Sequence, residues 1–218
     1  MYNLGDQYQC PTGPRGTLVA AMMNQQHAKL TLWGLSKITV GPEFVILDVG
    51  CGGGKTMGKL AKMAPQGKVF GLDYSLDMVK FSKKTNKTLV GKSRVEIIQG
   101  SVEKIGFRED FFDLVTACET YYFWKKFPDA LKEIKRVLKP GGKLLLVNEL
   151  KYRATPAKVI KETHVKLFSL EEIRRTLQTI GFVGVRVFTE VDSDWNAIVA
   201  EKVNYSPLTG RASPITTC

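Results

Sequence analysis

Apolar and polar residues alternate along the chain in blocks that predict strands and helices in turn. Short apolar runs at 44–49, 68–73, 94–99, 111–118 and 143–150 have the length and composition of buried strands. Between several of them, the segments 55–64, 75–86 and 127–138 are patterned as helices, and Pro140-Gly141-Gly142 is expected to stop the last one. Strands that alternate with helices predict parallel βαβ units in an open sheet covered on both faces.

Two further regions flank this alternating core. Residues 15–38 carry helix formers at mixed helical spacing, which predicts two short helices ended by Gly41-Pro42. Near the other end, Ser169 and Glu172 have the spacing of a capping box that begins a helix. The strand-like stretches 183–190 and 195–203 follow, joined by a turn too short for a crossover helix. We therefore expect them to pair as an antiparallel hairpin.

Composition narrows the class of protein. The chain has 218 residues, 44% hydrophobic and 24% charged, which fits one globular domain. Its four cysteines are far apart, so neither a metal site nor a disulfide framework is predicted. No apolar run approaches the roughly 20 residues of a membrane helix, and the first residues lack the pattern of a secretion signal. We therefore expect a cytoplasmic protein that does not bind a membrane.

The net charge of +11 concerns partners rather than fold. Much of it is expected to lie on a solvated lysine surface. The remaining interpretation is attraction to an acidic partner, which includes a nucleic acid, an anionic peptide and a carboxylate substrate.

The most informative stretch is DVGCGGGKT (48–56), directly after the first predicted strand. A phosphate-binding loop of the Walker type needs its first glycine at position 49, which is Val49. A dinucleotide fingerprint needs its third glycine at position 55, which is Lys55. Both patterns therefore fail by one residue. Lys55 and Thr56 are expected to start a helix and to face away from any phosphate.

What remains is a G-x-G-x-G pattern at Gly50, Gly52 and Gly54, preceded by an acid. With it, the stretch LKPGGKLLLV (138–147) and the terminal hairpin, the chain resembles the class I S-adenosylmethionine-dependent methyltransferases over residues 44–203. The resemblance implies an α/β, Rossmann-like doubly wound sheet of seven strands in the order 3-2-1-4-5-7-6, with strand 7 antiparallel and an N-terminal helical cap.

The resemblance also implies a division of the chain into functional parts. One methyltransferase domain would span 1–218, with the cap at 1–41 and the cofactor-binding core at 42–150. A variable substrate segment would follow at 151–168, then the last helix and hairpin at 169–203 and a tail at 204–218.

By the same resemblance, S-adenosylmethionine is the cofactor and S-adenosylhomocysteine the product. Asp73 would accept both ribose hydroxyls, and Ser101 would contact the adenine amine where the family often has an aspartate. The residues that the resemblance assigns to the cofactor are Asp48, Gly50, Cys51, Gly52, Gly54, Asp73, Tyr74, Ser101, Val102 and Cys118.

The methyl group would point toward the segment after the fourth strand and toward the N-terminal cap. Candidate catalytic residues there are His27, Glu119 and Tyr121, with Phe123 expected in the core instead. Candidate substrate-binding residues are Trp33, Tyr122, Trp124, Lys151 and Arg153, and the basic segment that contains the last two suggests an anionic substrate.

The substrate class follows from what the candidate site lacks. The segment ETYY (119–122) has no proline, unlike the amino-methylating DNA enzymes, and Cys118 follows Ala117 rather than the proline of cytosine-C5 enzymes. A nucleic-acid substrate is therefore disfavoured. We expect O-methylation of a carboxylate or hydroxyl on a small molecule or a peptide natural product. N-methylation, an NAD(P)- or nucleotide-dependent enzyme of similar fold, and a non-catalytic binding module stay as alternatives, and no oligomeric state is predicted.

Overall fold

The computed structural model describes residues 27–149 and 168–203. Within these residues, seven strands form one sheet in the order β3-β2-β1-β4-β5-β7-β6, and β7 runs antiparallel to both of its neighbours. The other pairs are parallel. The predicted strand order and the predicted hairpin are therefore confirmed. The strands are β1 (Val45–Val49), β2 (Lys68–Asp73), β3 (Val95–Gln99), β4 (Phe112–Cys118), β5 (Leu138–Glu149), β6 (Phe182–Thr189) and β7 (Trp195–Lys202).

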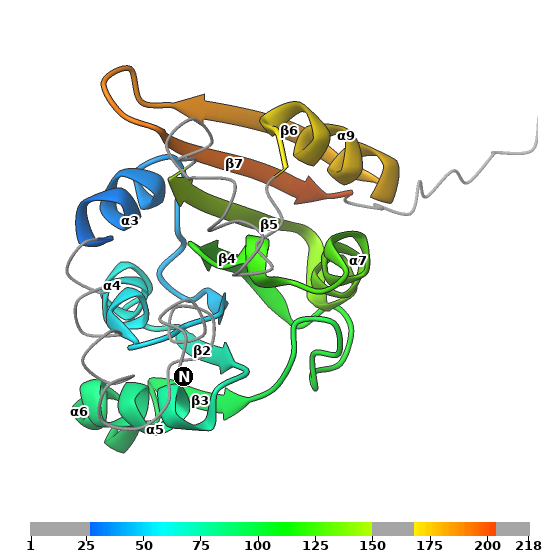
Figure 1. Cartoon of the computed structure of the whole chain (residues 1–218). Helices are drawn as coiled ribbons and strands as arrows, with labels where there is room; N and C mark the ends of the chain where they lie inside the picture. The colour runs from blue at the N-terminus through cyan, green and yellow to red at the C-terminus, as the bar shows by residue number, and fades with distance from the viewer. Residues whose placement is uncertain (1–26, 150–167, 204–218) are drawn as a thin grey trace, which may run out of the picture.

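Helices cover both faces of this sheet (Figure 1). Successive residues of a strand point to opposite faces. Leu144 and Leu146 accordingly pack with the helices on one face, whereas Leu145 and Val147 pack with those on the other. One face carries α7 (Phe127–Val137) and α9 (Leu170–Ile180); the other carries α3 (Ala28–Leu35), α4 (Lys55–Met63), α5 (Leu76–Thr85) and the short α6 (Lys87–Gly91).

Local sequence signals begin and end several helices as predicted. The Ser75 hydroxyl accepts the amide hydrogen of Met78, which caps α5. At α9, Ser169 and Glu172 form the expected reciprocal capping box. That helix ends at Gly181, whose φ of 87° lies in the left-handed region that glycine adopts readily.

Two predicted boundaries need correction. The helix expected at 127–138 ends at Val137, and the strand expected to begin at residue 143 begins at once with Leu138. The reason is that a residue before proline, here Lys139, is biased toward the extended conformation. Of the two helices expected within 15–38, the structure shows α3; the part before residue 27 lies outside the described residues.

The strand order reverses between β1 and β4. β1 pairs with β2 on one side and with β4 on the other, so the loops after these strands diverge above the sheet. In open α/β sheets ligands bind at such a switch point, outside the carboxyl ends of the strands. None of the helices in the described residues has the length and apolarity needed to cross a bilayer.

Candidate active site

A cavity of about 450 Å³ opens at the carboxyl ends of β1, β2 and β4. Its volume lies within the usual range for a small-molecule site. Most of the predicted site residues meet there. The predicted residues that line the cavity are His27, Asp48, Gly50, Cys51, Gly52, Asp73, Tyr74, Ser101, Val102, Cys118, Glu119 and Trp124.

The glycine loop forms the floor of the cavity. The amide hydrogens of Gly50 and Cys51 are donated to the Leu72 carbonyl, at 2.8 and 3.1 Å, which ties the loop to β2. Gly50 and Gly52 both have positive φ. A Cβ added at Gly52 would have no atom closer than 4.0 Å, because the position faces open space. The loop therefore leaves room for a ligand against its backbone.

Asp73 ends β2 beside this loop. Its two carboxylate oxygens accept the amide hydrogens of Gly52, at 2.7 Å, and Ser75, at 2.9 Å. Burial raises the pKa of Asp73, and these two amides act in the opposite direction. Each carboxylate oxygen keeps a lone pair for a further donor. Asp73 therefore both orders the glycine loop and can accept hydroxyl groups from a ligand in the cavity.

The loop after β3 forms another wall. Val102 is almost fully buried there, and the Ser101 hydroxyl accepts the amide hydrogen of Glu103 at 3.2 Å. Glu103 also lines the cavity, and its carboxylate accepts the amide hydrogen of Lys126 at 3.0 Å. A carboxylate thus lies two residues after the position where the family often has an aspartate.

Asp48 is a buried acid below the glycine loop. Thr116 donates its hydroxyl hydrogen to Asp48 Oδ1 at 2.7 Å. Burial raises the pKa of Asp48 to about 7, with a further contribution from the charge of Asp73 and an opposing one from the Thr116 hydrogen bond. At neutral pH this acid is therefore partly protonated, and a nearby ligand cation would favour its charged form.

This pKa predicts a pH-dependent stability. Because the folded pKa of Asp48 lies above its ordinary value of 3.8, its contribution to stability is complete below about pH 4. It is lost as the pH rises through about 7. Asp48→Asn, which stays neutral, is expected to raise the Tm of the ligand-free protein above that of the wild type at pH 8. The difference should shrink toward pH 5, as measured by thermal unfolding at several pH values; a constant difference would contradict the assigned pKa.

The two cysteines at the cavity are thiols rather than thiolates. Burial raises the pKa of both Cys51 and Cys118 well above the ordinary value, and the nearby Asp48 charge acts in the same direction. A thiol is a weak nucleophile compared with a thiolate. Neither cysteine is thus suited to attack a substrate.

A second cluster of polar residues surrounds Glu119, which follows β4. The Tyr122 hydroxyl donates to Glu119 Oε2 at 2.8 Å, and the amide of Glu149 donates to Glu119 Oε1. His27 Nε2 lies 3.8 Å from Glu119 Oε2. Glu119 also has a φ of 56°, a conformation that side chains other than glycine rarely adopt and that is frequent at functional sites.

The protonation of Tyr122 suits this arrangement. Burial raises the pKa of Tyr122 well above its ordinary value, and the charge of Glu119 raises it further. The phenol therefore keeps its proton and donates a hydrogen bond to the carboxylate. His27 and Glu119 both line the cavity, so together they can accept a proton from a bound molecule.

Several predicted roles around this cluster need correction. Tyr121 does not line the cavity: it is fully buried against Phe127 and Phe168, and its hydroxyl has no hydrogen-bond partner among the described residues. Tyr122 contacts Glu119 rather than the cavity. Phe123, expected in the core, does line it. The cause is the 3₁₀ helix η1 (Tyr121–Phe123), which turns these three side chains to different sides.

Two further predicted residues lie outside the cavity lining. Trp33 packs against Trp195, with ring centroids 6.1 Å apart. Gly54 is the N-cap residue of α4, and a Cβ at this position would clash with Ser82 and Asn86. Its role is therefore in packing. The predicted substrate residues Lys151 and Arg153 lie outside the described residues.

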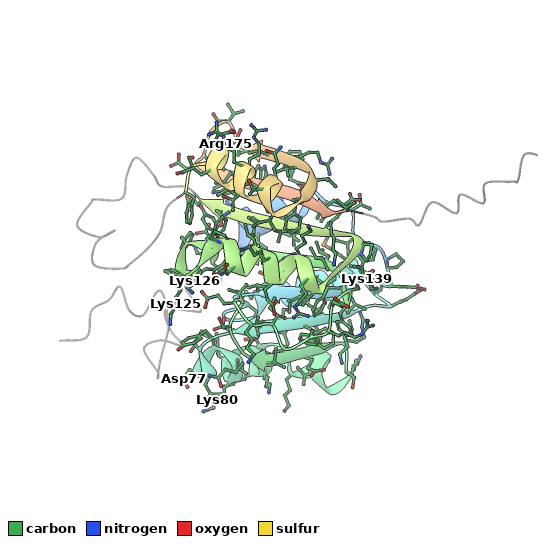
Figure 2. The ribbon with its side chains drawn as sticks, turned by 90° about the vertical axis from the view of Figure 1, so that its right-hand side faces the viewer. Asp77, Lys80, Lys125, Lys126, Lys139 and Arg175 are labelled. Carbon is green, nitrogen blue, oxygen red and sulfur yellow. The ribbon has the colours of Figure 1, made fainter. Side chains whose placement is uncertain are left out.

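Some lining residues were not predicted from the sequence. Lys55 and Thr56, expected to face away from a ligand, both line the cavity, as does Lys59 one turn later. Lys125 also lines it, and Figure 2 shows Lys125 on the same side of the molecule as Lys126, Asp77 and Lys80. Lys139 lies on the opposite side. A lysine in a polar stretch of a helix is usually expected to lie in solvent. Nothing in the sequence therefore indicated that Lys59 lines the cavity.

The lining fits S-adenosylmethionine. Asp73 would offer carboxylate oxygens to the ribose hydroxyls, Val102 would offer an apolar contact to the adenine, and the position of a Cβ at Gly52 faces open space. Asp48 supplies a buried carboxyl that favours a cation. No cluster of metal-ligating side chains occurs in the part of the chain that the structure describes.

Known proteins match part of this chain in sequence. Residues 47–146 match the family model described as a methyltransferase domain. The chain is 39% identical over 106 residues to a demethylmenaquinone methyltransferase of Lactococcus lactis, covering 47% of this chain and 40% of that protein. It is 30% identical over 122 residues to the uncharacterized methyltransferase YdaC of Bacillus subtilis, covering 56% and 65%. The chain thus spans less than two thirds of the length of these relatives.

Solved structures match over a larger share of the chain. A SAM-dependent methyltransferase from Aquifex aeolicus has a TM-score of 0.68 at 21% identity, over 86% of this chain and 98% of that one. The YcgJ protein from Bacillus subtilis has a TM-score of 0.63 at 21% identity, over 81% and 99%. The domain match over residues 47–146, the glycine loop and the sheet order support a class I S-adenosylmethionine-dependent methyltransferase.

Proposed function

We propose that this protein methylates an oxygen atom, in a carboxylate or a hydroxyl group, on a small molecule or a peptide. The observation that carries the proposal is the pairing of His27 with Glu119 at the cavity, 3.8 Å apart. A carboxylate acceptor is already ionised and needs no base, whereas a hydroxyl acceptor is made nucleophilic by losing its proton.

When bound, S-adenosylmethionine supplies a methyl group on a positive sulfur, which keeps the bonding electron pair as the methyl leaves. The protein positions the reacting groups and accepts the proton that a hydroxyl acceptor loses. His27 Nε2 accepts the proton of the acceptor hydroxyl, and Glu119 stabilises the resulting imidazolium. Tyr122 and the Glu149 amide hold Glu119 in place through hydrogen bonds to its two oxygens.

The acceptor is found by incubating the protein and methyl-labelled S-adenosylmethionine with host-cell extract, followed by mass spectrometry. Mild base removes a methyl ester but leaves methyl ethers, N-methyl and C-methyl groups. Label on nitrogen alone would contradict the proposal. A thermal shift with NAD or ATP, and none with S-adenosylhomocysteine, would contradict the cofactor as well.

The proposed base gives a kinetic prediction. His27→Gln is expected to lower kcat for a hydroxyl acceptor by roughly 100-fold, because general-base catalysis contributes about that much or more. The Kd for S-adenosylhomocysteine should change little. Lys29→Gln, an exposed position on the same helix that does not line the cavity, is the control. An unchanged kcat for a hydroxyl acceptor would remove His27 from the mechanism.

The named relatives favour a second candidate acceptor, demethylmenaquinone. In its reduced form this ring carries hydroxyl groups, and loss of one proton to His27 would make an adjacent ring carbon nucleophilic. The same protein groups would then serve methylation at carbon. Incubation with reduced demethylmenaquinone tests this candidate, since a base-stable methyl on the ring supports it and an unchanged quinone contradicts it.

A further inference from the structure

Lys59 bridges two helices at one end of the cavity. From the second turn of α4 it reaches across to α3, where its Nζ donates to the Ala28 carbonyl at 3.1 Å. Figure 1 shows α3 and α4 as neighbours on the same face of the sheet. Ala28 follows His27 directly, and Lys59 and His27 both line the cavity. The ammonium group and the proposed proton acceptor therefore lie at the same end, which we call the α3 end.

The charge of Lys59 is incompletely satisfied by the protein. An ammonium group has three donors, and in the described part of the chain the Ala28 carbonyl is the hydrogen-bond acceptor for Nζ. Lys55, one helical turn earlier, lines the same cavity, so two like charges lie in the i, i+4 relation. Desolvation lowers the pKa of Lys59, the neighbouring Cys118 acts in the opposite direction, and the charge of Lys55 lowers the pKa further. Burial and the charge of Lys55 both disfavour the charged form of Lys59, and an anion bound at the α3 end would offset both effects.

The acids around the cavity do not supply that anion. No carboxylate of the described residues lies within ion-pair distance of Lys59. Asp48 accepts from Thr116, and Asp73 accepts from backbone amides. Glu119 accepts from Tyr122 and from the Glu149 amide.

We propose that Lys59, assisted by Lys55, is a carboxylate-binding subsite at the α3 end of the cavity. The carboxylate has two sources: the methionine part of the cofactor and an acidic group of the acceptor. The second source rests on the proposed function, because it requires an acceptor that binds beside His27. In that case the acceptor carries a carboxylate that binds Lys59 and, separately, the oxygen atom that is methylated.

The first arm of the test measures the cofactor by calorimetry. Lys59→Gln is expected to raise the Kd for S-adenosylhomocysteine about 10-fold or more if the carboxylate is the cofactor's, as for the loss of a charged hydrogen bond. Binding of 5′-methylthioadenosine, which has no carboxylate, should then stay unchanged. Lys59→Arg should retain most of the affinity. Lys62→Gln, an exposed lysine of the same helix outside the cavity lining, is the matched control.

The second arm measures the acceptor side with the S-adenosylhomocysteine complex. The probes are 4-hydroxybenzoate and its neutral methyl ester. An acceptor carboxylate predicts that the wild type binds the acid about 10-fold more tightly than the ester and that Lys59→Gln loses this preference. Equal behaviour of Lys59→Gln and Lys62→Gln in both arms overturns the subsite. Failure of every protein variant and the wild type to bind S-adenosylhomocysteine would instead overturn the proposed function.

Discussion

Replacing Asp73 by alanine is expected to weaken the binding of S-adenosylhomocysteine by at least about 100-fold. Asp73 accepts the amide hydrogens of Gly52 and Ser75 and faces the cavity, so the change removes two acceptors for the ribose and loosens the glycine loop. Hydrogen bonds to a charged group contribute roughly 1.5–3 kcal/mol each. Isothermal titration calorimetry measures the effect directly.

Asp73→Asn distinguishes the charge from the shape of this side chain. An amide offers one acceptor oxygen, and its nitrogen would face the amide hydrogen of Gly52 or Ser75. Its affinity should therefore fall nearly as far as that of the alanine variant. Asp129→Ala removes an exposed acid paired with Lys132 and serves as the control. Full affinity in either Asp73 variant would refute the role of this carboxylate in binding the ribose.

Replacing Gly50 by alanine is expected to lower the free energy of unfolding by roughly 2–4 kcal/mol. The φ of Gly50 is 66°, and a left-handed conformation costs a side-chain-bearing residue about 1–2 kcal/mol. In addition, the new Cβ would collide with the side chain of Thr120, which is itself buried. Chemical denaturation of the ligand-free protein measures the loss.

Gly52→Ala is the matched comparison for this glycine. Its φ of 48° carries a similar backbone cost, but its Cβ would enter open space in the cavity. Its stability should therefore fall less than that of Gly50→Ala, by about 1–2 kcal/mol, while S-adenosylhomocysteine binding is lost. Equal stability losses in the two variants would contradict the packing of Gly50 against Thr120.

The sheet order was predicted through the family resemblance, and most residues that line the cavity near the glycine loop were predicted because their signals are local. Each signal lies within a short stretch of sequence. These signals are the glycines at fixed spacing, the acids at the ends of β1 and β2, and the short hairpin turn. Gly54 shows the limit of this reasoning. It belongs to the same glycine pattern, yet contacts with Ser82 and Asn86, far along the chain, give it a role in packing.

The part of the cavity around Glu119 could not be predicted in the same way. The run Tyr121–Trp124 has no helical or strand period that assigns its side chains to faces. Their directions depend on the left-handed backbone of Glu119 and on the 3₁₀ turn that follows. Lys59 was missed for a related reason, since only the packing of α4 beside α3 brings its ammonium into the cavity.

The hydrogen bond from the Glu149 amide to Glu119 joins the end of β5 to the residue that follows β4. It holds Glu119, the proposed partner of the His27 imidazolium, at the point where β5 ends. The proposed catalytic pair and the proposed substrate segment after β5 are in this way separate parts of the chain. Under the proposed roles, a change of residues after position 149 would alter the substrate and leave the hydrogen bonds that hold Glu119 unchanged.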